Sequence, residues 1–379
     1  MKRVVILCVW LFSVVAGHAQ LSLDECRRLA RENYPEIRQY DLVHQTEQYN
    51  LSNAARAWIP QLAFSAQATW QTDAPNFPKE LTGMLAQQGL EIPGLRKDQY
   101  KVALELNQTI WDGGKSVADK RIARAEAAEQ KTMTDVDLYE LEGRVDDLYF
   151  GILLLDERIA QTNLTLNLLR SNLEKVRALQ RNGVAMQSDA DVLEAELLSV
   201  GQQLIQFESS CDSYRRMLGI FIGQKVGDRK LQRPSAVQPL SGESARPELA
   251  MFAAKIDRLT AQEKMVKSSS MPRLGFFAQG YYGYPGLDYM QSMMNSDWSW
   301  NAMLGVKLSW NFGAYYTQKN NLNKLRTSRQ QVEVQRDVFL FNMNLQAAQE
   351  NGDIARLRKA IADDDRIVAL RRSVREAAE

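Results

Sequence analysis

The chain has 379 residues, of which 47 are Lys or Arg and 46 are Asp or Glu, so its formal charge is close to zero. The lack of a basic surplus argues against nucleic-acid binding, and two histidines with three cysteines argue against most zinc, iron–sulfur and disulfide-rich folds. The chain contains only 21 glycines and 10 prolines. Because these residues interrupt helices and strands, their low number favours long uninterrupted secondary structure.

The first 19 residues are typical of a secretory signal peptide. Lys2 and Arg3 precede the apolar run Val4–Val15, and small residues follow at the predicted cleavage point. That run is too short for a membrane-spanning helix, which needs roughly 20 apolar residues. We therefore predict an exported protein whose mature chain begins at Gln20.

The mature chain is predicted to contain two copies of one unit. A helical segment ends at Pro60 in the first copy and at Pro272 in the second. Two strands follow each proline, and the second strand of each pair ends at Trp111 or Trp310, just before glycine. The predicted parts are a signal peptide (1–19), a first repeat (20–222), a linker (223–245) and a second repeat (246–379).

The predicted strands have one apolar and one polar face. Apolar side chains alternate with polar or small ones in 61–71, and 298–310 shows the same period of two. Strands of this length suit a tilted membrane crossing, and tryptophans at their ends are typical of an interfacial aromatic girdle. The predicted girdle consists of Trp70, Trp111, Trp298, Trp300 and Trp310. A soluble β-sandwich is the alternative that the strand pattern alone leaves open.

A heptad pattern runs through the proline-free segment 115–181. Its apolar residues fall at alternating spacings of three and four, which predicts a coiled-coil helix. A turn is predicted at Asn182-Gly183, and a second apolar series returns from Leu193 to Phe221. These segments predict a long antiparallel helical hairpin. Cys211 lies on the returning seam, where we expect a buried small residue, and the sequence does not decide whether it pairs with Cys26.

Four strands per chain are too few to close a barrel, and an open sheet edge in lipid leaves backbone groups without hydrogen bonds. Several chains are therefore expected to share one barrel, with eight strands from two chains or twelve from three. The competing hypothesis is an exported coiled-coil scaffold or surface adhesin without transport activity. It explains the heptads but neither the amphipathic strands nor the duplication.

Several motifs together resemble the TolC family of outer-membrane efflux proteins. They are residues 21–36, Trp58-Ile59-Pro60, Trp111-Asp112-Gly113-Gly114, and Arg181-Asn182-Gly183-Val184 followed by Ser188-Asp189. The resemblance spans nearly the whole mature chain. It implies a mainly α fold with a membrane β-barrel portion, in which a homotrimer builds a twelve-stranded barrel and an α-helical tunnel. It also implies a cell outer membrane location, with the tunnel extending into the periplasm.

The function that the resemblance implies is that of a channel in a tripartite efflux or type I secretion system. Its expected partners are a periplasmic adaptor (membrane fusion) protein, an inner-membrane transporter and outer-membrane lipid. We find no nucleophile elbow, phosphate-binding loop or metal-ligand cluster, so no enzyme activity, catalytic residue, metal or cofactor is predicted.

Two site predictions follow from the resemblance. Ser188 and Asp189 are expected at the periplasmic gate, where three Asp189 carboxylates select cations or hold the constriction closed. Helix capping by Ser188 or Asp189 is an alternative that is compatible with this role. The turn residues Arg181, Asn182, Gly183 and Val184 are expected to contact the adaptor, although a bare turn also explains them.

The second repeat has no counterpart of this turn. Gly183 follows Gly114 by 69 residues, and the same spacing from Gly313 predicts a second tip near residue 382, beyond Glu379. We therefore expect this chain to lack the second tip and its returning helix, to assemble poorly as a trimer and not to transport alone. The gate carboxylates of the second repeat are then unassigned.

Overall fold

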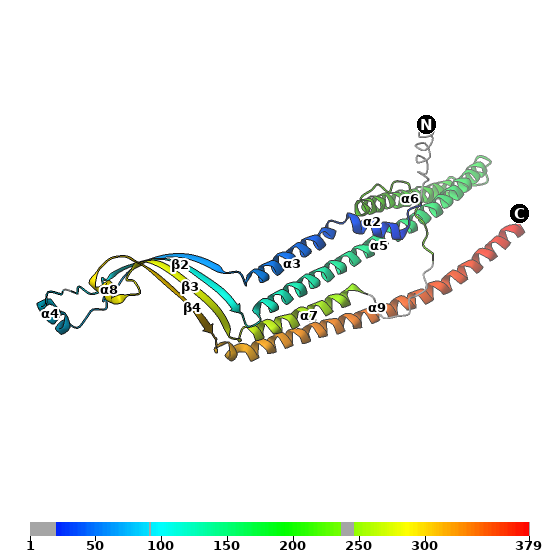
Figure 1. The fold of residues 1–379 in the computed structure, drawn as a ribbon. Coiled ribbons are helices and arrows are strands. Elements are labelled where there is room, and N and C mark those ends of the chain that lie inside the picture. Colours follow the sequence, from blue (N-terminus) through cyan, green and yellow to red (C-terminus); the bar gives the residue numbers. More distant parts are fainter. Residues whose placement is uncertain (1–19, 91, 236–245, 379) are drawn as a thin grey trace, which may run out of the picture. The chain divides into compact units, whose positions relative to one another are not determined.

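The computed structural model describes residues 20–90, 92–235 and 246–378 (Figure 1). The predicted signal peptide lies outside the described residues, as does part of the predicted linker, 236–245. The chain divides into two compact units, one of residues up to Val43 with Gln130–Met251, the other of His44–Glu129 with Phe252–Glu379. Each unit therefore draws segments from both predicted repeats.

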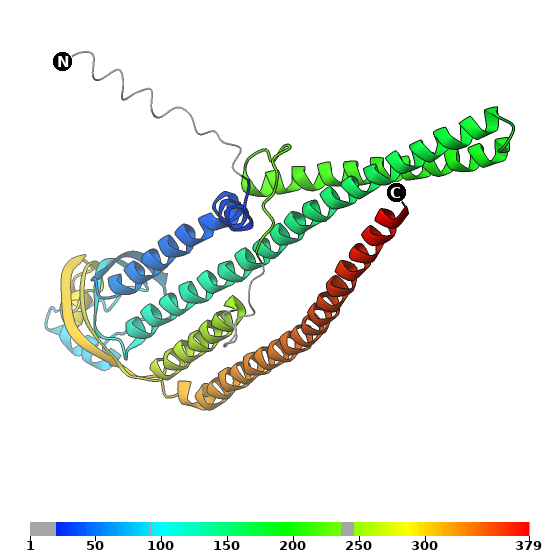
Figure 2. The ribbon, with the colours of Figure 1, turned by 90° about the vertical axis from the view of Figure 1, so that its right-hand side faces the viewer.

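The first unit is built around a helical hairpin. Its helices α5 (Lys115–Arg181, which begins in the second unit) and α6 (Gln187–Ile222) run antiparallel and side by side (Figures 1 and 2). The two predicted heptad seams are buried or half-buried along this hairpin, as a coiled-coil contact requires. The fully or nearly fully buried seam residues are Leu138, Leu141, Val145, Ile152, Leu166, Leu173, Val200, Cys211 and Leu218. The predicted hairpin is confirmed.

The core of this unit lies where helix α2 (Leu23–Asn33) packs on the hairpin. Tyr149 is fully buried there, and its hydroxyl lies within 2.7 Å of the carbonyl oxygens of Leu21 and Gln232. Leu21 also forms a parallel bridge with Leu231, and the Arg27 guanidinium donates to the Asp146 carboxylate at 2.7 Å. The segment around Leu21 is thus bound to the chain that follows α6. The short helix η1 (Pro35–Arg38) and helix α3 (Gln39–Arg56) continue from α2.

The second unit contains one four-stranded sheet, which Figure 1 shows as a single curved ribbon of adjacent strands. Neighbouring strands pair antiparallel in the order β1-β2-β3-β4. Short helices occupy the two connections at one end of the sheet. The elements of this unit include β1 (Gln61–Trp70), α4 (Lys79–Gln87), β2 (Asp98–Trp111), α7 (Pro247–Ser268), β3 (Arg273–Tyr284), α8 (Tyr289–Met294), β4 (Ser299–Ser309) and α9 (Ala314–Ala378).

The two strand-to-helix junctions are built alike. The Asp112 carboxylate accepts a hydrogen bond from the Gly114 N–H at 2.9 Å, and the Asn311 side-chain oxygen accepts one from the Gly313 N–H at 3.0 Å. Asp112 also accepts from the backbone N–H of Ser116 at 2.6 Å, which caps the start of α5. Burial opposes ionisation of Asp112, but the hydrogen bonds from Ser116 and Gly114 outweigh it and lower the pKa of this carboxyl.

Helix α9 is long and lacks a packed partner over much of its length. It has 65 residues, and every residue from 344 to 377 is exposed. Within the described part of the chain, no helix is both long enough and apolar enough to cross a lipid bilayer.

Candidate functional site

The sheet presents one continuous apolar face. Because side chains alternate along each strand, the register places every second residue of all four strands on a common side. Its central residues are Leu62, Phe64, Ala66, Ala68, Val102, Leu104, Leu106, Phe276, Ala278, Ala302, Leu304, Val306 and Leu308. Leu304 is 75% exposed and Trp300, on the same face, 82%. An exposed apolar surface this extensive indicates contact with lipid or another apolar partner.

Aromatic side chains flank that face at both ends. Near the α4 and α8 connections, the Trp298 ring stacks on Tyr100 with centroids 5.7 Å apart, and Tyr282 lies 5.0 Å from Trp300. Trp70 ends β1 in the same region, opposite Asp98. At the other end, Trp111 closes β2, and the Trp310 ring lies 4.7 Å from that of Phe312. The five predicted girdle tryptophans therefore form two groups, one at each end of the sheet.

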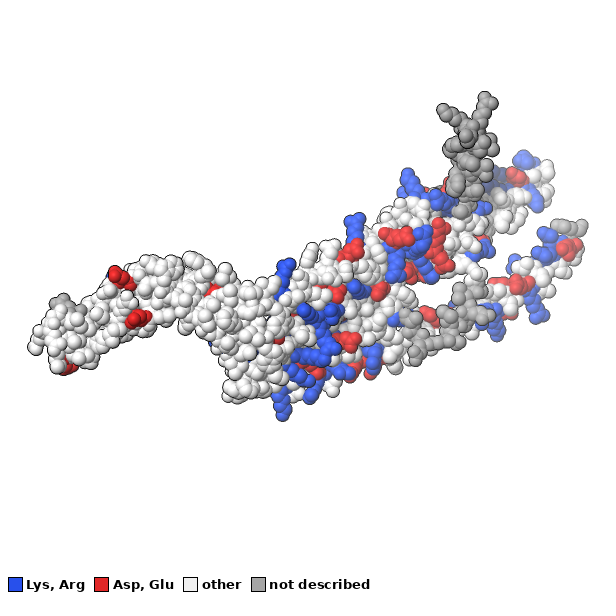
Figure 3. Space-filling view, viewed as in Figure 1, with Lys and Arg blue, Asp and Glu red and all other residues white. Residues whose placement is uncertain are grey.

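The spacing between these groups fits a membrane. Val102 lies opposite Tyr282, at one aromatic group, and Trp111 lies nine residues further along β2, at the other. Nine residues span about 30 Å along a strand, and a tilt of about 40° reduces this to roughly 23 Å across the bilayer, close to the ~25 Å apolar band of outer-membrane barrels. Figure 3 shows Lys and Arg gathered over the helices and almost absent over the strands on the visible face.

Both outer edges of the sheet are unpaired. β1 pairs only with β2, and β4 pairs only with β3, among the residues that the structure describes. The free edge of each outer strand therefore has backbone N–H and C=O groups with no strand partner in this chain. These groups need partners if the apolar face is in lipid, because no water is available there.

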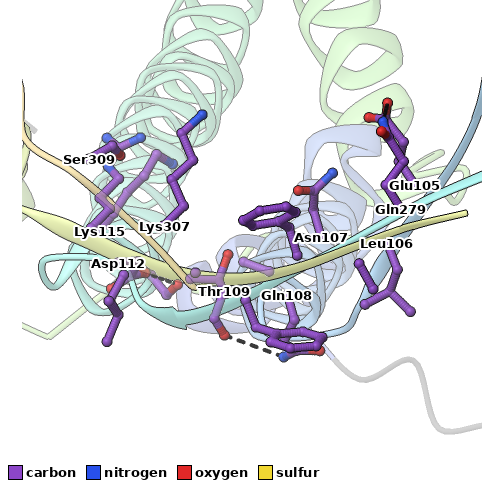
Figure 4. Close-up of a pocket in the computed structure, with 18 of the residues that line it drawn as sticks. Glu105, Leu106, Asn107, Gln108, Thr109, Asp112, Lys115, Gln279, Lys307 and Ser309 are labelled. Atoms are coloured by element: carbon purple, nitrogen blue, oxygen red, sulfur yellow. Dashed lines mark hydrogen bonds between the residues drawn. The ribbon is translucent and has the colours of Figure 1, made fainter. Parts of the chain in front are cut away.

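The opposite face of the sheet is polar. Lys101 donates to the side-chain oxygen of Gln279 at 3.0 Å, and the Gln279 amide donates to the Glu105 carboxylate. These bonds join strands of the two predicted repeats. A hollow of about 550 Å³ lies on this face and extends toward the start of α5, as the side chains in Figure 4 show.

The tip of the helical hairpin is the second candidate site. Helix α5 ends in a Schellman motif, because the Val184 N–H bonds the Leu179 carbonyl and the Gly183 N–H bonds the Gln180 carbonyl, both at 2.9 Å. Gly183 has φ +75°, a left-handed conformation that favours glycine, and so the predicted turn is present. Arg181, Asn182, Gly183 and Val184 are all exposed.

The predicted gate residues lie in the first turn of α6. The N-cap residue is Met186, not Ser188 or Asp189. Asp189 nevertheless helps to cap the helix, since its carboxylate accepts from the Met186 N–H at 2.9 Å. Both Ser188 and Asp189 are exposed.

Cys26 and Cys211, the two cysteines among the described residues, are free and buried. Cys211 lies on the predicted seam, 3.3 Å from the Arg215 Nε that donates to its sulfur. Burial raises the pKa of both thiols, that of Cys26 to about 12. Among the described residues, no cluster of three or more His, Cys, Asp or Glu side chains is placed to hold a metal ion.

Three features that matter for the sites were not predicted from sequence. Tyr149, at the base of the hairpin, falls one position beyond the seam residue Leu148. Lys307 and Arg273 project from the polar face. The alternation of apolar and polar residues in 298–310 indicates this position for Lys307, but no sequence pattern indicated it for Arg273. No sequence pattern within β2 or β3 predicts that these two strands pair and so join the two predicted repeats.

Comparison with known proteins gives a consistent result. A sequence model described as "Outer membrane efflux protein" matches residues 27–223 of this chain. No curated protein matches the sequence. The outer membrane protein VceC of Vibrio cholerae aligns with a TM-score of 0.61 and 15% identity, over 84% of this chain and 75% of VceC.

Two further solved channels are similar. The outer-membrane channel OprN has a TM-score of 0.60 and 13% identity, over 84% of this chain and 71% of OprN. The CmeC outer membrane channel of Campylobacter jejuni has a TM-score of 0.57 and 15% identity, over 84% of this chain and 68% of CmeC. Identities this low show a common fold, which agrees with the mainly α architecture and four-stranded sheet.

Proposed function

Because this chain belongs to the outer membrane efflux protein family, we propose that it is the outer-membrane channel of a tripartite efflux or type I secretion system. The family is one of channels, located in the outer membrane and extending into the periplasm. In the proposed role, substrates pass from an inner-membrane transporter, through a periplasmic adaptor protein, into this channel. The protein performs no chemistry on them.

The observation that carries the proposal is the sheet with two unpaired edges. β4 of one copy pairs with β1 of the next, which satisfies the free backbone groups in lipid. Three copies then close a barrel of twelve strands, wide enough for an aqueous lumen, whereas eight strands from two copies leave an interior filled by side chains. A homotrimer is therefore the assembly that conducts.

The two faces of the sheet then have separate roles. The apolar face with its aromatic groups contacts outer-membrane lipid, with Trp70, Trp298 and Trp300 at one interface and Trp111 and Trp310 at the other. The polar face lines the lumen, and there Lys101, Gln279 and Glu105 are joined by side-chain hydrogen bonds.

The hairpin tip is proposed as the periplasmic end of the channel. Arg181, Asn182, Gly183 and Val184 form a rigid, exposed turn that suits contact with the adaptor. The carboxylate of Asp189 is exposed beside it, and Ser188 is its neighbour, so three copies around an axis bring three carboxylates to one constriction.

The trimer is tested by cross-linking the two edge strands. In a Cys26→Ala, Cys211→Ala background, Ser65→Cys on β1 is combined in turn with Asn301→Cys, Met303→Cys or Gly305→Cys on β4. All four positions share the polar face, and neighbouring positions on one strand face sample the unknown register between copies. Oxidation traps trimers covalently even where assembly is weak, as expected for this chain, so one combination should give a covalent trimer in outer-membrane fractions.

The matched control is Lys101→Cys with Asn301→Cys, since β2 and β4 are not neighbours within the sheet and β2 has no free edge. It should yield no cross-linked trimer. A protein that fractionates away from the outer membrane, or remains monomeric with every pair, contradicts the channel and favours the scaffold or adhesin hypothesis.

A further inference from the structure

Two cations on the polar face of the sheet have no anionic partner. Lys307 lies opposite Gly275 and Arg273 lies opposite Ser309, so the register places both side chains on the same side as Glu105 and Gln279. Both side chains are exposed. Among the described residues, no ion pair involves either of them.

The carboxylates nearest to this pair in the fold are already engaged. Asp112 is buried and accepts hydrogen bonds from Gly114 and Ser116. Asp119 forms an ion pair with Lys115 at 2.7 Å. Asp119 is therefore neutralised by Lys115, whereas Asp112 is held by neutral donors, forms no ion pair with Lys307 or Arg273 and offsets at most one of their two charges.

Glu105 is too far along the sheet to compensate for these charges. Its row of the register contains Gln279 and Met303, and Lys307 is four residues beyond Met303 on β4. Four residues span about 13 Å along a strand, whereas exposed charges are screened over about 8 Å at physiological salt. In the view of Figure 4, Glu105 and Gln279 lie at one side of the hollow and Lys307 at the other.

These cations line a hollow that also offers neutral donors and apolar surface. The hollow of about 550 Å³ is lined by the neutral polar side chains of Asn107, Thr109 and Ser309 and by the apolar side chains of Phe277 and Met303. Lys115 and the carboxylates of Glu105, Asp112 and Asp119 also line it. Anionic head groups suit the cations and the donors, and an apolar body suits Phe277 and Met303.

We propose that Arg273 and Lys307 form a basic ring at the helix-side end of the barrel lumen and attract organic anions that carry a phosphate, sulfate or carboxylate group. With two cations per chain, a trimer contains six in this ring. The proposal rests on the proposed trimeric channel. It adds a substrate class, anionic amphiphiles, and the two residues that select it.

Ion selectivity tests the ring in the full chain. The protein is reconstituted in planar bilayers, and the reversal potential is measured across a tenfold KCl gradient. We expect chloride to be preferred over potassium, and the Arg273→Gln, Lys307→Gln double variant to lower that preference by up to about fivefold for each charge removed. Lys307→Arg is the matched control, because it keeps the charge and should keep the preference.

Anion binding provides a readout that does not need an open gate. Titration of the purified protein with inorganic triphosphate, followed by calorimetry, should show binding that weakens at high salt and is lost in the double variant. Triphosphate added to the bilayer should also block current through the unaltered channel more strongly than through the double variant.

The outcomes separate the ring from the channel. A trimer with no chloride preference, or with equal selectivity and triphosphate binding in the double variant, overturns the ring and leaves the channel in place. A protein that forms no trimer and no conducting pore contradicts the proposed channel and therefore also the basic ring, which depends on it.

Discussion

Helices α5 and α9 are nearly equal in length, at 67 and 65 residues, but differ in what surrounds them. Both carry apolar residues at spacings of three and four. On α5 the residues Leu141 and Val145 are fully buried, because α6 and α2 pack against them. On α9 the residues Leu357 and Ile361 remain at least half exposed.

The difference shows that a heptad pattern predicts which helix face will pack against a partner, but not which segment that partner is. Apolar surface is stabilising only when it leaves water, and a single helix cannot bury its own stripe. The α5 stripe meets its partner within the chain, across the turn at Gly183. From residue 344 to 377 the α9 stripe remains exposed and meets no partner among the described residues.

The largest expected effect comes from truncating matched leucines in the two helices. Leu141→Ala leaves a cavity at a site with 0% exposure and should lower the free energy of unfolding by about 2–5 kcal/mol. Leu357→Ala removes a side chain that is 50% exposed and should change it by no more than about 0.5 kcal/mol. Denaturant titration in detergent, with hydrogen exchange of the helix amides, measures both. Equal losses would mean that α9 is packed as tightly as α5.

Matched glycines sharpen the comparison. A Cβ at Gly151 on α5 would lie 2.6 Å from the Tyr214 ring, so Gly151→Ala should destabilise the hairpin by about 1–3 kcal/mol. A Cβ at Gly352 on α9 meets nothing within 4 Å, so Gly352→Ala should stabilise the helix by up to about 1 kcal/mol. Opposite signs in thermal unfolding are expected. A loss at Gly352 would reveal a neighbour close to α9.

Tyr149 at the base of the hairpin should show a dependence on alkaline pH. Burial, with a smaller contribution from Cys26, raises the pKa of Tyr149 from 10 to about 12, so the folded state retains the phenol proton between those values. Its contribution to stability is full below pH 10 and is lost as the pH rises through about 12. Tyr149→Phe should cost about 1 kcal/mol at neutral pH, because the hydroxyl no longer bonds the buried carbonyls.

The measurement is the difference in unfolding free energy between the Tyr149→Phe variant and the unaltered chain, followed from pH 8 to pH 12. Cys26 titrates in both proteins, so its contribution cancels to first order. The difference should shrink as the pH rises from 10 to 12, and a constant difference would contradict this assignment.

The smallest effect on stability is expected at the tip. Asp189→Ala removes the carboxylate that accepts the Met186 N–H and should destabilise α6 by about 0.5–1 kcal/mol. If Asp189 also acts at the gate, the same substitution should raise the conductance of the closed channel in bilayers. Asp191→Ala is the control, since Asp191 accepts a bond from Gln187 on the same turn but is not predicted at the gate. Unchanged conductance leaves Asp189 with a capping role alone.

Much of the fold was predictable because it depends on local periodicity. The period of two in 61–71 and 298–310 predicts strands with one apolar face, and the register confirms it residue by residue. The heptads of 115–181 predict the hairpin seam, and Asn182-Gly183 predicts its turn. The helices before β1 and β3 end at Arg56 and Ser268, each four residues before the proline that predicts a stop.

The rest was not predictable because it depends on which distant segments meet. Tyr149 is fully buried, whereas the seam residue Leu148 is only half-buried, because the chain near Leu21 and Leu231 covers that side of the helix. Met186 and not Ser188 became the N-cap of α6, because the Schellman turn after Gly183 sets where the next helix can begin.

The sequence by itself determined which residues lie on the two faces of each strand and on the seam of each helix, because both follow from backbone geometry. Only the tertiary structure decided that β2 pairs with β3, since strand order depends on contacts between repeats and not on any local pattern. That pairing brings Lys101 to Gln279 and leaves Lys307 and Arg273 without carboxylate partners. The edges β1 and β4 are free for the same reason, and their backbone groups are what a neighbouring copy is proposed to bind.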